Sequence, residues 1–474
     1  MKTEGKGGVT LEDLAEAVIG HALSLGAEFA DLRIETISGV NILVMDGKTK
    51  TVTARIEKGC GVRSFVGGGW GFAVCNGLEL SELKTAAEIS VRLAKVSREK
   101  AKLSFKIEST KPIRKTIEYP CRTAPSTVAV ADKLSFVLGL DKSMSAHDER
   151  IVSRSASYDD FEGDRIVANS FGTLVKTRET WTLASCSAWG KSDGIVQRGH
   201  EAVGNVGGFE LMHTDAAARC GEEAAELAIR LLDSKPVPAG KFTCVLDNKM
   251  TGLLAHEAFG HACEADAILA GASVLEGMEG KAVAHEDVTL VDDPTVSETF
   301  GFFPYDWEGV KSTKHVLIQD GVLNEFMHNL ETSSRMGRPP NGAARADSYA
   351  SPPIVRMSNT YISPGNAKKD ELIGDLKEGL LIKGGQYGYV EPAKGQFMFK
   401  CDEAYQIKDG VVGQRYRDAI LTGLIQEVLK DVTGIADDFE LIDPGYCGKS
   451  GQDARTTDGG PHIRVENVVV GGLT

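Results

Sequence analysis

The sequence predicts an α+β protein of two domains, the second of them rich in strands, from three observations. The chain has 474 residues, which is long for a single hydrophobic core. Helical and strand periodicities both occur in its first half, whereas strand patterns outnumber helical ones in its second half. Between the halves, residues 234–241 carry two prolines and a glycine that break regular structure. We therefore predict an N-terminal α+β domain at 1–235 and a C-terminal domain at 241–474, which forms a barrel or a rolled antiparallel sheet.

The N-terminal half is expected to alternate helices with antiparallel strands. Thr10 and Asp13 have the spacing of a capping box and precede a helix with one apolar face, which Gly26 should end. The dipeptide Asp46-Gly47 predicts a tight hairpin. The glycines at 67–69 lie between strand patterns and lack the lysine of a phosphate-binding loop, so we interpret them as a turn. The other expected elements are strands at 31–36, 40–45 and 51–56, helices at 81–102, 126–143 and 214–232, and antiparallel sheet within 151–200.

The C-terminal half is expected to begin with one strand and one helix and to continue mostly as strands. A strand at 242–246 precedes a helix that should start within 248–251. Asp320-Gly321 and Asp409-Gly410 each lie between alternating apolar and polar residues and predict two hairpins. The chain should close on a strand at 463–470.

Composition excludes several classes of partner. The formal net charge is −14, from 53 basic and 67 acidic side chains, and no run of lysine or arginine stands out, so we expect no nucleic-acid partner. The N-terminus has no apolar core of signal-peptide length, and no stretch reaches about 18 apolar residues, so we expect a cytoplasmic protein without a membrane partner. The nine cysteines are scattered and form no C-x-x-C pair, which predicts buried thiols rather than a disulfide framework.

The segment His256-Glu257-Ala258-Phe259-Gly260-His261 carries the strongest chemical signal in the chain. A neutral imidazole is a good zinc ligand, and a glutamate beside a ligating histidine is placed to take a proton from water. The two histidines are five residues apart. On a regular α-helix this spacing puts them about 140° apart, too far for one metal to reach both. Either the match is accidental, or the helix widens locally to a π-turn, a distortion that Gly260 makes less costly.

A second segment, Gly445-Tyr446-Cys447-Gly448-Lys449-Ser450-Gly451-Gln452, changes this assessment. Together with residues 253–266 it resembles the TldD/PmbA family of metalloproteases, in its TldD branch. Three further stretches, at 345–350, 356–361 and 395–399, are similar to the same branch in the same order. One departure is Trp307, because the resemblance predicts a second acidic residue at this position. The role that this acidic residue has in relatives, such as shaping the substrate channel, is therefore not carried over to this chain.

The resemblance implies a zinc-dependent peptidase whose metal site lies on the helix of the C-terminal domain. His256, His261 and Cys447 would hold one Zn²⁺, the only cofactor expected, and would leave the fourth position of the metal open. Glu257 would be the catalytic residue, as the general base that activates water. The flanking glycines, Gly445 and Gly448, would let a loop bring the sulfur close to the helix. Extended or unfolded peptides are the implied substrates, and a peptide that adds to an exposed strand edge would suit a strand-rich domain.

The resemblance also implies a dimer, either with an inactive PmbA/TldE-like paralogue or with itself. Two other functions stay open beside the peptidase. The chain could be a non-catalytic assembly or chaperone-like subunit with a structural metal, or a zinc hydrolase that acts on a small molecule. The roles of Glu264 and Asp266 are open as well, since each could orient a histidine by accepting a hydrogen bond or could be solvated.

Overall fold

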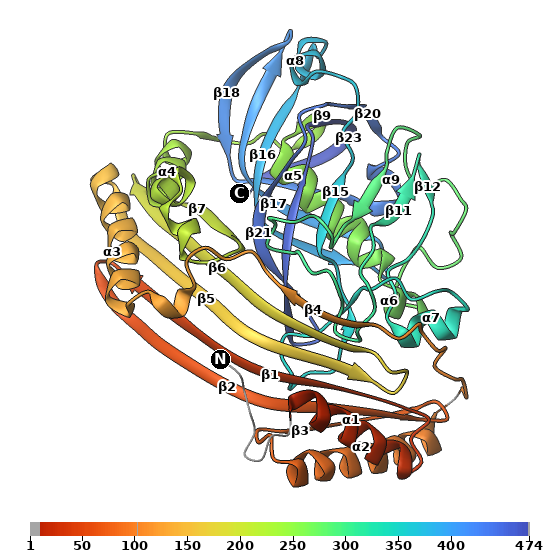
Figure 1. Ribbon diagram of the computed structural model, residues 1–474. Helices are drawn as coiled ribbons and strands as arrows, with labels where there is room; N and C mark the ends of the chain where they lie inside the picture. The colour runs from red at the N-terminus through yellow and green to blue at the C-terminus, as the bar shows by residue number, and fades with distance from the viewer. Residues whose placement is uncertain (1–9, 102, 473–474) are drawn as a thin grey trace.

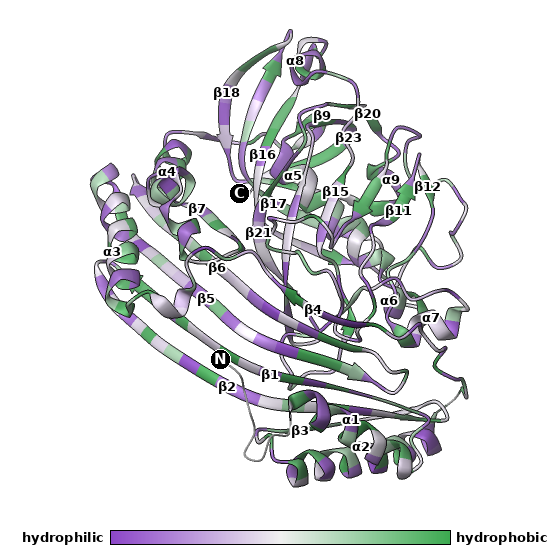
Figure 2. Cartoon of the chain, viewed as in Figure 1, coloured by the Kyte–Doolittle hydropathy of each residue, from purple (hydrophilic) through white to green (hydrophobic). Residues whose placement is uncertain are grey.

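The computed structural model describes residues 10–101 and 103–472 and confirms an α+β fold with a strand-rich C-terminal region (Figure 1). One long sheet belongs to the N-terminal part of the chain, and a barrel and a second sheet belong to the C-terminal part. Figure 2 shows alternating hydrophilic and hydrophobic residues along the long N-terminal strands, as expected for strands with one covered face. The domain boundary predicted at 235–241 stays a prediction.

The N-terminal sheet has seven strands in the order β3-β2-β1-β5-β6-β4, with β7 paired to β6. The two strands predicted at 31–36 and 40–45 form one strand, β1, because residues 37–39 keep pairing with β2 and residues 37 and 38 also pair with β5. At Gly39, an added Cβ would lie 2.3 Å from the carbonyl oxygen of Asp160, so this glycine allows close packing of strands rather than a break. The strands are β1 (Phe29–Met45), β2 (Lys48–Val66), β3 (Gly69–Cys75), β4 (Arg114–Glu118), β5 (Ile151–Asn169), β6 (Leu174–Ser192) and β7 (Ile195–Val206).

Four helices cover the two ends of this sheet (Figure 1). Helices α1 (Leu11–Ser24) and α2 (Leu80–Lys100) pack against residues 30–34 of β1, whereas α3 (Val130–His147) and α4 (Asp215–Leu232) pack against residues 40–44. The capping box of Thr10 and Asp13 is confirmed, with both reciprocal hydrogen bonds present. Helix α3 begins later than predicted, because residues 125–127 form a 3₁₀ turn instead. The Asp46-Gly47 hairpin and the turn at 67–69 are confirmed by positive φ angles at Asp46, Gly47, Gly67 and Gly68.

The C-terminal part contains a closed barrel of five strands in the order β16-β9-β23-β19-β17, in which β17 pairs again with β16. Its interior is filled by apolar side chains such as Leu246, Ile382 and Phe399. The barrel strands are β9 (Gly240–Leu246), β16 (Glu378–Glu391), β17 (Gln396–Lys408), β19 (Ala419–Leu424) and β23 (Ile463–Gly472), and β8 (Lys235–Pro236), β18 (Val411–Arg417) and β20 (Val432–Ile435) extend them.

A second, six-stranded sheet lies beside the barrel in the order β12-β11-β10-β15-β22-β21. The predicted hairpin turns at Asp320-Gly321 and Asp409-Gly410 are confirmed, since all four residues have positive φ. The strands of this sheet are β10 (Leu290–Asp292), β11 (His315–Gln319), β12 (Val322–Leu323), β15 (Asn359–Ile362), β21 (Glu440–Lys449) and β22 (Gln452–Gly460). The remaining elements are β13 (Ala344–Arg345), β14 (Ile354–Val355), α6 (Ala265–Leu269), α7 (Leu330–Met336), α8 (Lys369–Gly374) and α9 (Ile425–Val428).

The predicted motif helix passes between the barrel and the second sheet. It begins as α5 (Asn248–Leu253) directly after β9, and Asp247 caps it by accepting a hydrogen bond from the backbone N–H of Met250. Gly252 lets this helix approach β22 closely, because an added Cβ would lie 2.3 Å from the backbone nitrogen of Gly459. Across residues 10–101 and 103–472, no helix is long and apolar enough to cross a membrane.

Candidate metal centre

The two histidines of the motif are brought together by a π-helical turn, which is one of the two alternatives that the five-residue spacing left open. Residues 254–260 form this turn, and the backbone N–H of His261 donates to the carbonyl of His256, five residues earlier. The two imidazole centroids are 5.3 Å apart and their planes differ by 85°. Gly260 has ordinary helical backbone angles, so its predicted role in easing the distortion is wrong. Its lack of a side chain makes room for Met357 instead, since an added Cβ would lie 2.0 Å from the Sδ atom.

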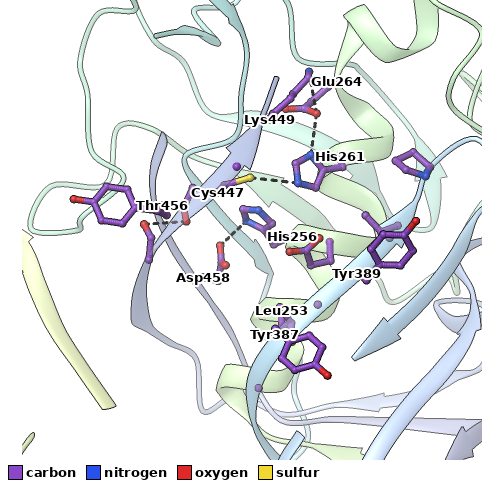
Figure 3. A pocket seen from close by; sticks show the side chains of 18 of the residues that line it. Leu253, His256, His261, Glu264, Tyr387, Tyr389, Cys447, Lys449, Thr456 and Asp458 are labelled. Atoms are coloured by element: carbon purple, nitrogen blue, oxygen red, sulfur yellow. Dashed lines mark hydrogen bonds and ion pairs between the residues drawn. The ribbon is translucent and has the colours of Figure 1, made fainter. Parts of the chain in front are cut away.

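Cys447 reaches the same point from the second sheet. Its Sγ atom lies 3.3 Å from Nε2 of His261, and one ligand atom from each of Cys447, His256 and His261 lies within 4.8 Å of the others. Figure 3 shows the three side chains pointing toward one another, the histidines from the motif helix and the cysteine from the strand that faces it. The prediction of a glycine-dependent loop is wrong, because Cys447 lies on β21 and a Cβ at Gly445 would meet no atom within 4 Å.

A carboxylate contacts the Nδ1 atom of each imidazole, on the side of the ring away from Cys447. Asp458 of β22 lies 2.9 Å from Nδ1 of His256, and Glu264 lies 3.0 Å from Nδ1 of His261. Lys449 in turn contacts Glu264 at 3.1 Å and Asp266 at 2.7 Å. Glu264 is therefore a hydrogen-bond partner of a histidine, whereas Asp266 pairs with the lysine. Because each Nδ1 is occupied, the Nε2 atoms are the ones available to a metal, and two imidazoles with a thiolate are a donor set that suits zinc.

Asp458 was missed by sequence reasoning. It follows two threonines and precedes two glycines near the C-terminus, and nothing in that run indicates a partner for a histidine. Its position depends on the parallel pairing of β22 with β15 and on the close contact between α5 and β22, which no local pattern predicts.

The side chains of the centre shift one another's protonation. Burial alone would raise the pKa of the Cys447 thiol, but the imidazoles of His256 and His261 lower it to about 4. Burial alone would lower the pKa of His261, but Glu264 and Cys447 raise it to about 10. The cysteine is therefore already ionised at neutral pH, which is the form that binds metals. A metal would displace protons from the imidazoles, so its affinity should rise with pH.

The centre lies at the wall of a cavity of about 740 Å³. Glu257, next to His256, lines this cavity and packs against β16, where a Cβ added to Gly388 would lie 2.7 Å from Cγ of Glu257. Tyr387 and Tyr389, both more than half exposed, stand along the same strand (Figure 3). The carboxylate predicted as a base is thus beside the candidate ligands and open to the cavity.

Two strand edges border this cavity. Strand β16 pairs with β17 on one edge, but on the other edge it pairs with β9 only at Leu380–Ile382. The backbone N–H of Gly384 donates to Asp247, and residues 385–391 have no strand partner on this edge within the described part of the chain. Strand β21 is the outermost strand of its sheet and carries Cys447. Residues 385–391 and residues 443–449 both contribute to the lining. Each edge presents backbone N–H and C=O groups that an extended chain could pair with.

Trp307 lies outside this cavity. It is buried, and the guanidinium carbon of Arg165 lies 3.6 Å from the centroid of its ring. Its acidic neighbours are structural: Asp306 accepts backbone N–H groups of Glu308 and Val310 at 2.9 Å, and Glu308 pairs with Arg63. The position that departs from the expected pattern therefore lines a different, smaller cavity.

Comparison with known proteins points to one family. Three domain profiles match the chain, namely "PmbA/TldA metallopeptidase domain 1" at residues 30–94, the "central domain" at 123–232 and the "C-terminal domain" at 239–472. A protein of Methanothermobacter thermautotrophicus described as a metalloprotease is 38% identical over 94% of this chain and 96% of its own length. A Saccharolobus solfataricus protein described as a zinc metalloprotease TldD homolog is 26% identical over 96% of this chain and 99% of its own length. The structure of TldE from Thermococcus kodakarensis has a TM-score of 0.76 at 18% identity and covers 97% of this chain and 100% of that one, which shows a shared fold.

Proposed function

Since the chain belongs to the PmbA/TldD metallopeptidase family, we propose that it is a zinc-dependent peptidase that hydrolyses extended or unfolded peptides. The observation that carries this proposal is the convergence of two imidazoles and one thiolate, within 4.8 Å of one another, at the wall of an open cavity that Glu257 also lines. Three ligands and one open position are typical of catalytic zinc sites.

His256, His261 and Cys447 would hold the zinc. When bound there, zinc would act as a Lewis acid that polarises a carbonyl group and lowers the pKa of water toward about 7. Asp458 and Glu264 keep the imidazoles oriented through their Nδ1 atoms. Glu257 accepts a proton from the attacking water and passes it to the leaving amine, which is the role of a general base and then of a general acid.

The two strand edges support an extended substrate. A peptide that lies between β16 and β21 could pair its backbone with either edge, which would hold it without reading its sequence. The exposed rings of Tyr387 and Tyr389 would then contact its side chains. A structural metal, the main alternative, would need a fourth protein ligand, and within the described residues the cluster has three.

We also propose that the protein works in the cytoplasm as a dimer, either with an inactive PmbA/TldE-like paralogue or with itself. This chain supplies the whole candidate ligand set, so a partner would supply walls of the substrate cavity rather than ligands. Light scattering of the protein purified alone, and again with any co-purifying chain from its native host, would give the stoichiometry. A monomer that cleaves peptides efficiently would contradict the dimer.

Metal analysis of the purified protein tests the site directly. We expect about one zinc per chain in the wild type and much less in Cys447→Ser, because the thiolate is one of three ligands. Cys401→Ser is the matched control, since this thiol is also buried but lies in the barrel core. Equal zinc in the wild type and Cys447→Ser would show that the third ligand lies elsewhere. No zinc in the wild type after reconstitution would rule out the proposed metallopeptidase.

A further inference from the structure

A second cavity, of about 280 Å³, lies between the N-terminal sheet and the β21–β22 hairpin. Its volume corresponds to about nine water molecules of the liquid, which is enough for a small organic molecule. It shares Tyr446 with the metal cavity, but none of the candidate ligands lines it. The residues that line it include Arg165, Trp181, Phe303, Trp307, Arg345 and Arg455.

The hairpin separates the two cavities because alternate residues of a strand point to opposite faces. Cys447 and Ala454 are direct partners across β21 and β22, and so are Tyr446 and Arg455. Directly paired residues share a face of the sheet, so the second pair points away from the metal centre. The hairpin that supplies Cys447 to one cavity therefore forms the roof of the other.

Arg345 places a buried positive charge in this cavity without a carboxylate in contact with it among the residues that the structure describes. It is 5% exposed, and its Nη1 atom donates to the carbonyls of Met357 and Arg455, each at 2.6 Å. Within residues 10–101 and 103–472 it forms no ion pair with a carboxylate. Burial, and then the neighbouring charges of Arg455 and Arg356, lower its pKa to about 9. A buried guanidinium without an anion is costly, and a bound carboxylate would relieve that cost.

The other buried charges around the cavity are already paired. Arg165 contacts Glu35 at 3.0 Å and Glu179 at 3.1 Å, and Arg455 also pairs with Glu179. Three guanidinium groups, counting Arg345, thus face two buried carboxylates.

Buried Asp292 and Glu179 act on the charge of Arg345 through space, but neither forms an ion pair with it. Buried Asp292 accepts hydrogen bonds from Ser358 and Thr360 and lies 3.4 Å from His315. At the rim, Asp159 lies 3.7 Å from Arg55. The other rim acids, Glu57, Asp347 and Asp453, are exposed to solvent. Within the described residues, the guanidinium of Arg345 therefore contacts backbone carbonyls and no carboxylate, and a bound carboxylate would supply that contact.

Aromatic rings form the other walls. Phe161 and Trp181 stack with centroids 5.6 Å apart, and the guanidinium of Arg345 lies 4.8 Å from the ring centroid of Phe303. Trp307, under Arg165, adds a further ring. Such walls favour a ligand with an apolar or aromatic body, and a single cation among them fixes the orientation of a charged group.

We propose that this second cavity binds the carboxylate of a small organic acid with an apolar or aromatic body, and that Arg345 recognises the carboxylate. The acid can be the C-terminal residue of a peptide or a free small molecule, since both present the same group. The proposal stands apart from the zinc site, because it needs neither zinc nor peptide cleavage.

Calorimetric titration of the wild-type protein compares N-acetyl-phenylalanine with N-acetyl-phenylalanine amide, which lacks only the charge. We expect the acid to bind at least about tenfold more tightly than the amide. Two of the four tryptophans, Trp181 and Trp307, line the cavity, so the acid should also change the tryptophan fluorescence. Equal binding of acid and amide, or binding of neither, would overturn the proposal.

Two variants locate the binding. Arg345→Lys keeps the charge but loses the fork of donors, so we expect about tenfold weaker binding of the acid. Ala346→Leu should block binding by filling the cavity while Arg345 stays in place. Arg338→Lys, at an exposed ion pair elsewhere, is the control and should bind like the wild type. Unchanged binding in Ala346→Leu would place the acid elsewhere and overturn the proposal even if Arg345→Lys fails to fold.

A tripeptide that ends in phenylalanine distinguishes the two sources. Tighter binding of the free-acid tripeptide than of N-acetyl-phenylalanine would identify a peptide C-terminus as the ligand. Binding of the single-residue acid alone would identify a free small acid. If the tripeptide binds equally well as acid and as amide, the carboxylate is not recognised and the proposal fails.

Discussion

Charged side chains are buried both in the metal centre and in a second cluster, which consists of Asp31, Arg33, Arg63 and Glu308. The two regions differ in which polar atoms remain available to a ligand. In the cluster, Asp31 accepts from Arg33 at 3.1 Å and also from Arg63, and Glu308 accepts from Arg63 at 2.5 Å. Glu308 also accepts the backbone N–H of Leu330 at 2.6 Å. Both carboxylates are thus neutralised within the chain, and the cluster ties β1 and β2 to the start of α7.

In the metal centre, the carboxylates bind only the far sides of the imidazoles. Asp458 and Glu264 occupy the Nδ1 atoms, so the Nε2 atoms and the sulfur of Cys447 converge on one another at the cavity wall. The difference shows that buried charge alone does not indicate chemistry. A functional centre is recognised by donor atoms that meet one another where a cavity gives access.

The largest expected effect is on catalysis at the metal centre. Replacing Glu257 with Gln should lower peptide hydrolysis by about 10²- to 10⁴-fold, because the amide cannot accept a proton. Zinc content should not change, since this side chain is not among the candidate ligands. Turnover of a fluorogenic peptide and elemental analysis of the same sample measure both. Full activity in this variant would remove Glu257 from the mechanism.

A substitution in the Asp31 cluster should lower the stability of the fold and leave the zinc content unchanged. Asp31→Asn leaves Arg33 buried without its carboxylate, so we expect the free energy of unfolding to fall by about 3–5 kcal/mol. Urea unfolding measures this, and zinc content should stay at the wild-type level. Glu16→Gln, in an exposed ion pair with Arg114, is the control and should unfold like the wild type. If Asp31→Asn loses zinc while it stays folded, the two regions are not independent.

A smaller effect, on zinc affinity, is expected when the hydrogen-bond partner of a ligating histidine is replaced. Asp458→Asn should weaken zinc affinity by about 10- to 100-fold, because the amide holds the imidazole of His256 less well in a ligating orientation. Competition with a chromogenic chelator measures the affinity. Asp453→Asn is a matched control, since this residue lies on the same strand but points to the other face of the hairpin. An unchanged zinc affinity in Asp458→Asn would show that this carboxylate does not orient His256 for metal binding.

The smallest expected effect concerns the pKa of the Cys447 thiol in the zinc-free protein. The ultraviolet absorbance of its thiolate, taken as the difference from Cys447→Ser, should disappear only near pH 4, far below the value of about 8.5 for a free cysteine. Because the pKa is lower in the folded protein than in the unfolded chain, the ionised thiol stabilises the fold fully above about pH 8.5. That contribution is lost as the pH falls through about 4. A midpoint near 8.5 would show that the imidazoles do not act on the sulfur.

Local chemistry made much of this structure predictable. Asp46-Gly47, Asp320-Gly321 and Asp409-Gly410 specify their turns through backbone angles that need no distant partner. The five-residue spacing of His256 and His261 left a π-turn or an accidental match as the alternatives, and the π-turn is the one that the structure has.

Features that depend on distant segments were not predictable in this way. The barrel closes through parallel pairing of β16 with β9, more than a hundred residues apart in the chain. The partner of His256, Asp458, lies 202 residues away. Such pairings depend on which faces pack together, and the alternation within a strand does not specify the neighbour.

Arg356 sets the register on which both cavities depend. This fully buried side chain donates to the carbonyl of Cys447 on β21 and to the carbonyl of Gln452 on β22, so it clamps the two strands of the hairpin in one alignment. A slip of one residue would turn Tyr446 toward the zinc site and Cys447 toward the second cavity. An insertion of one residue within β21, between the turn and Cys447, would therefore exchange the two faces and disable both sites at once.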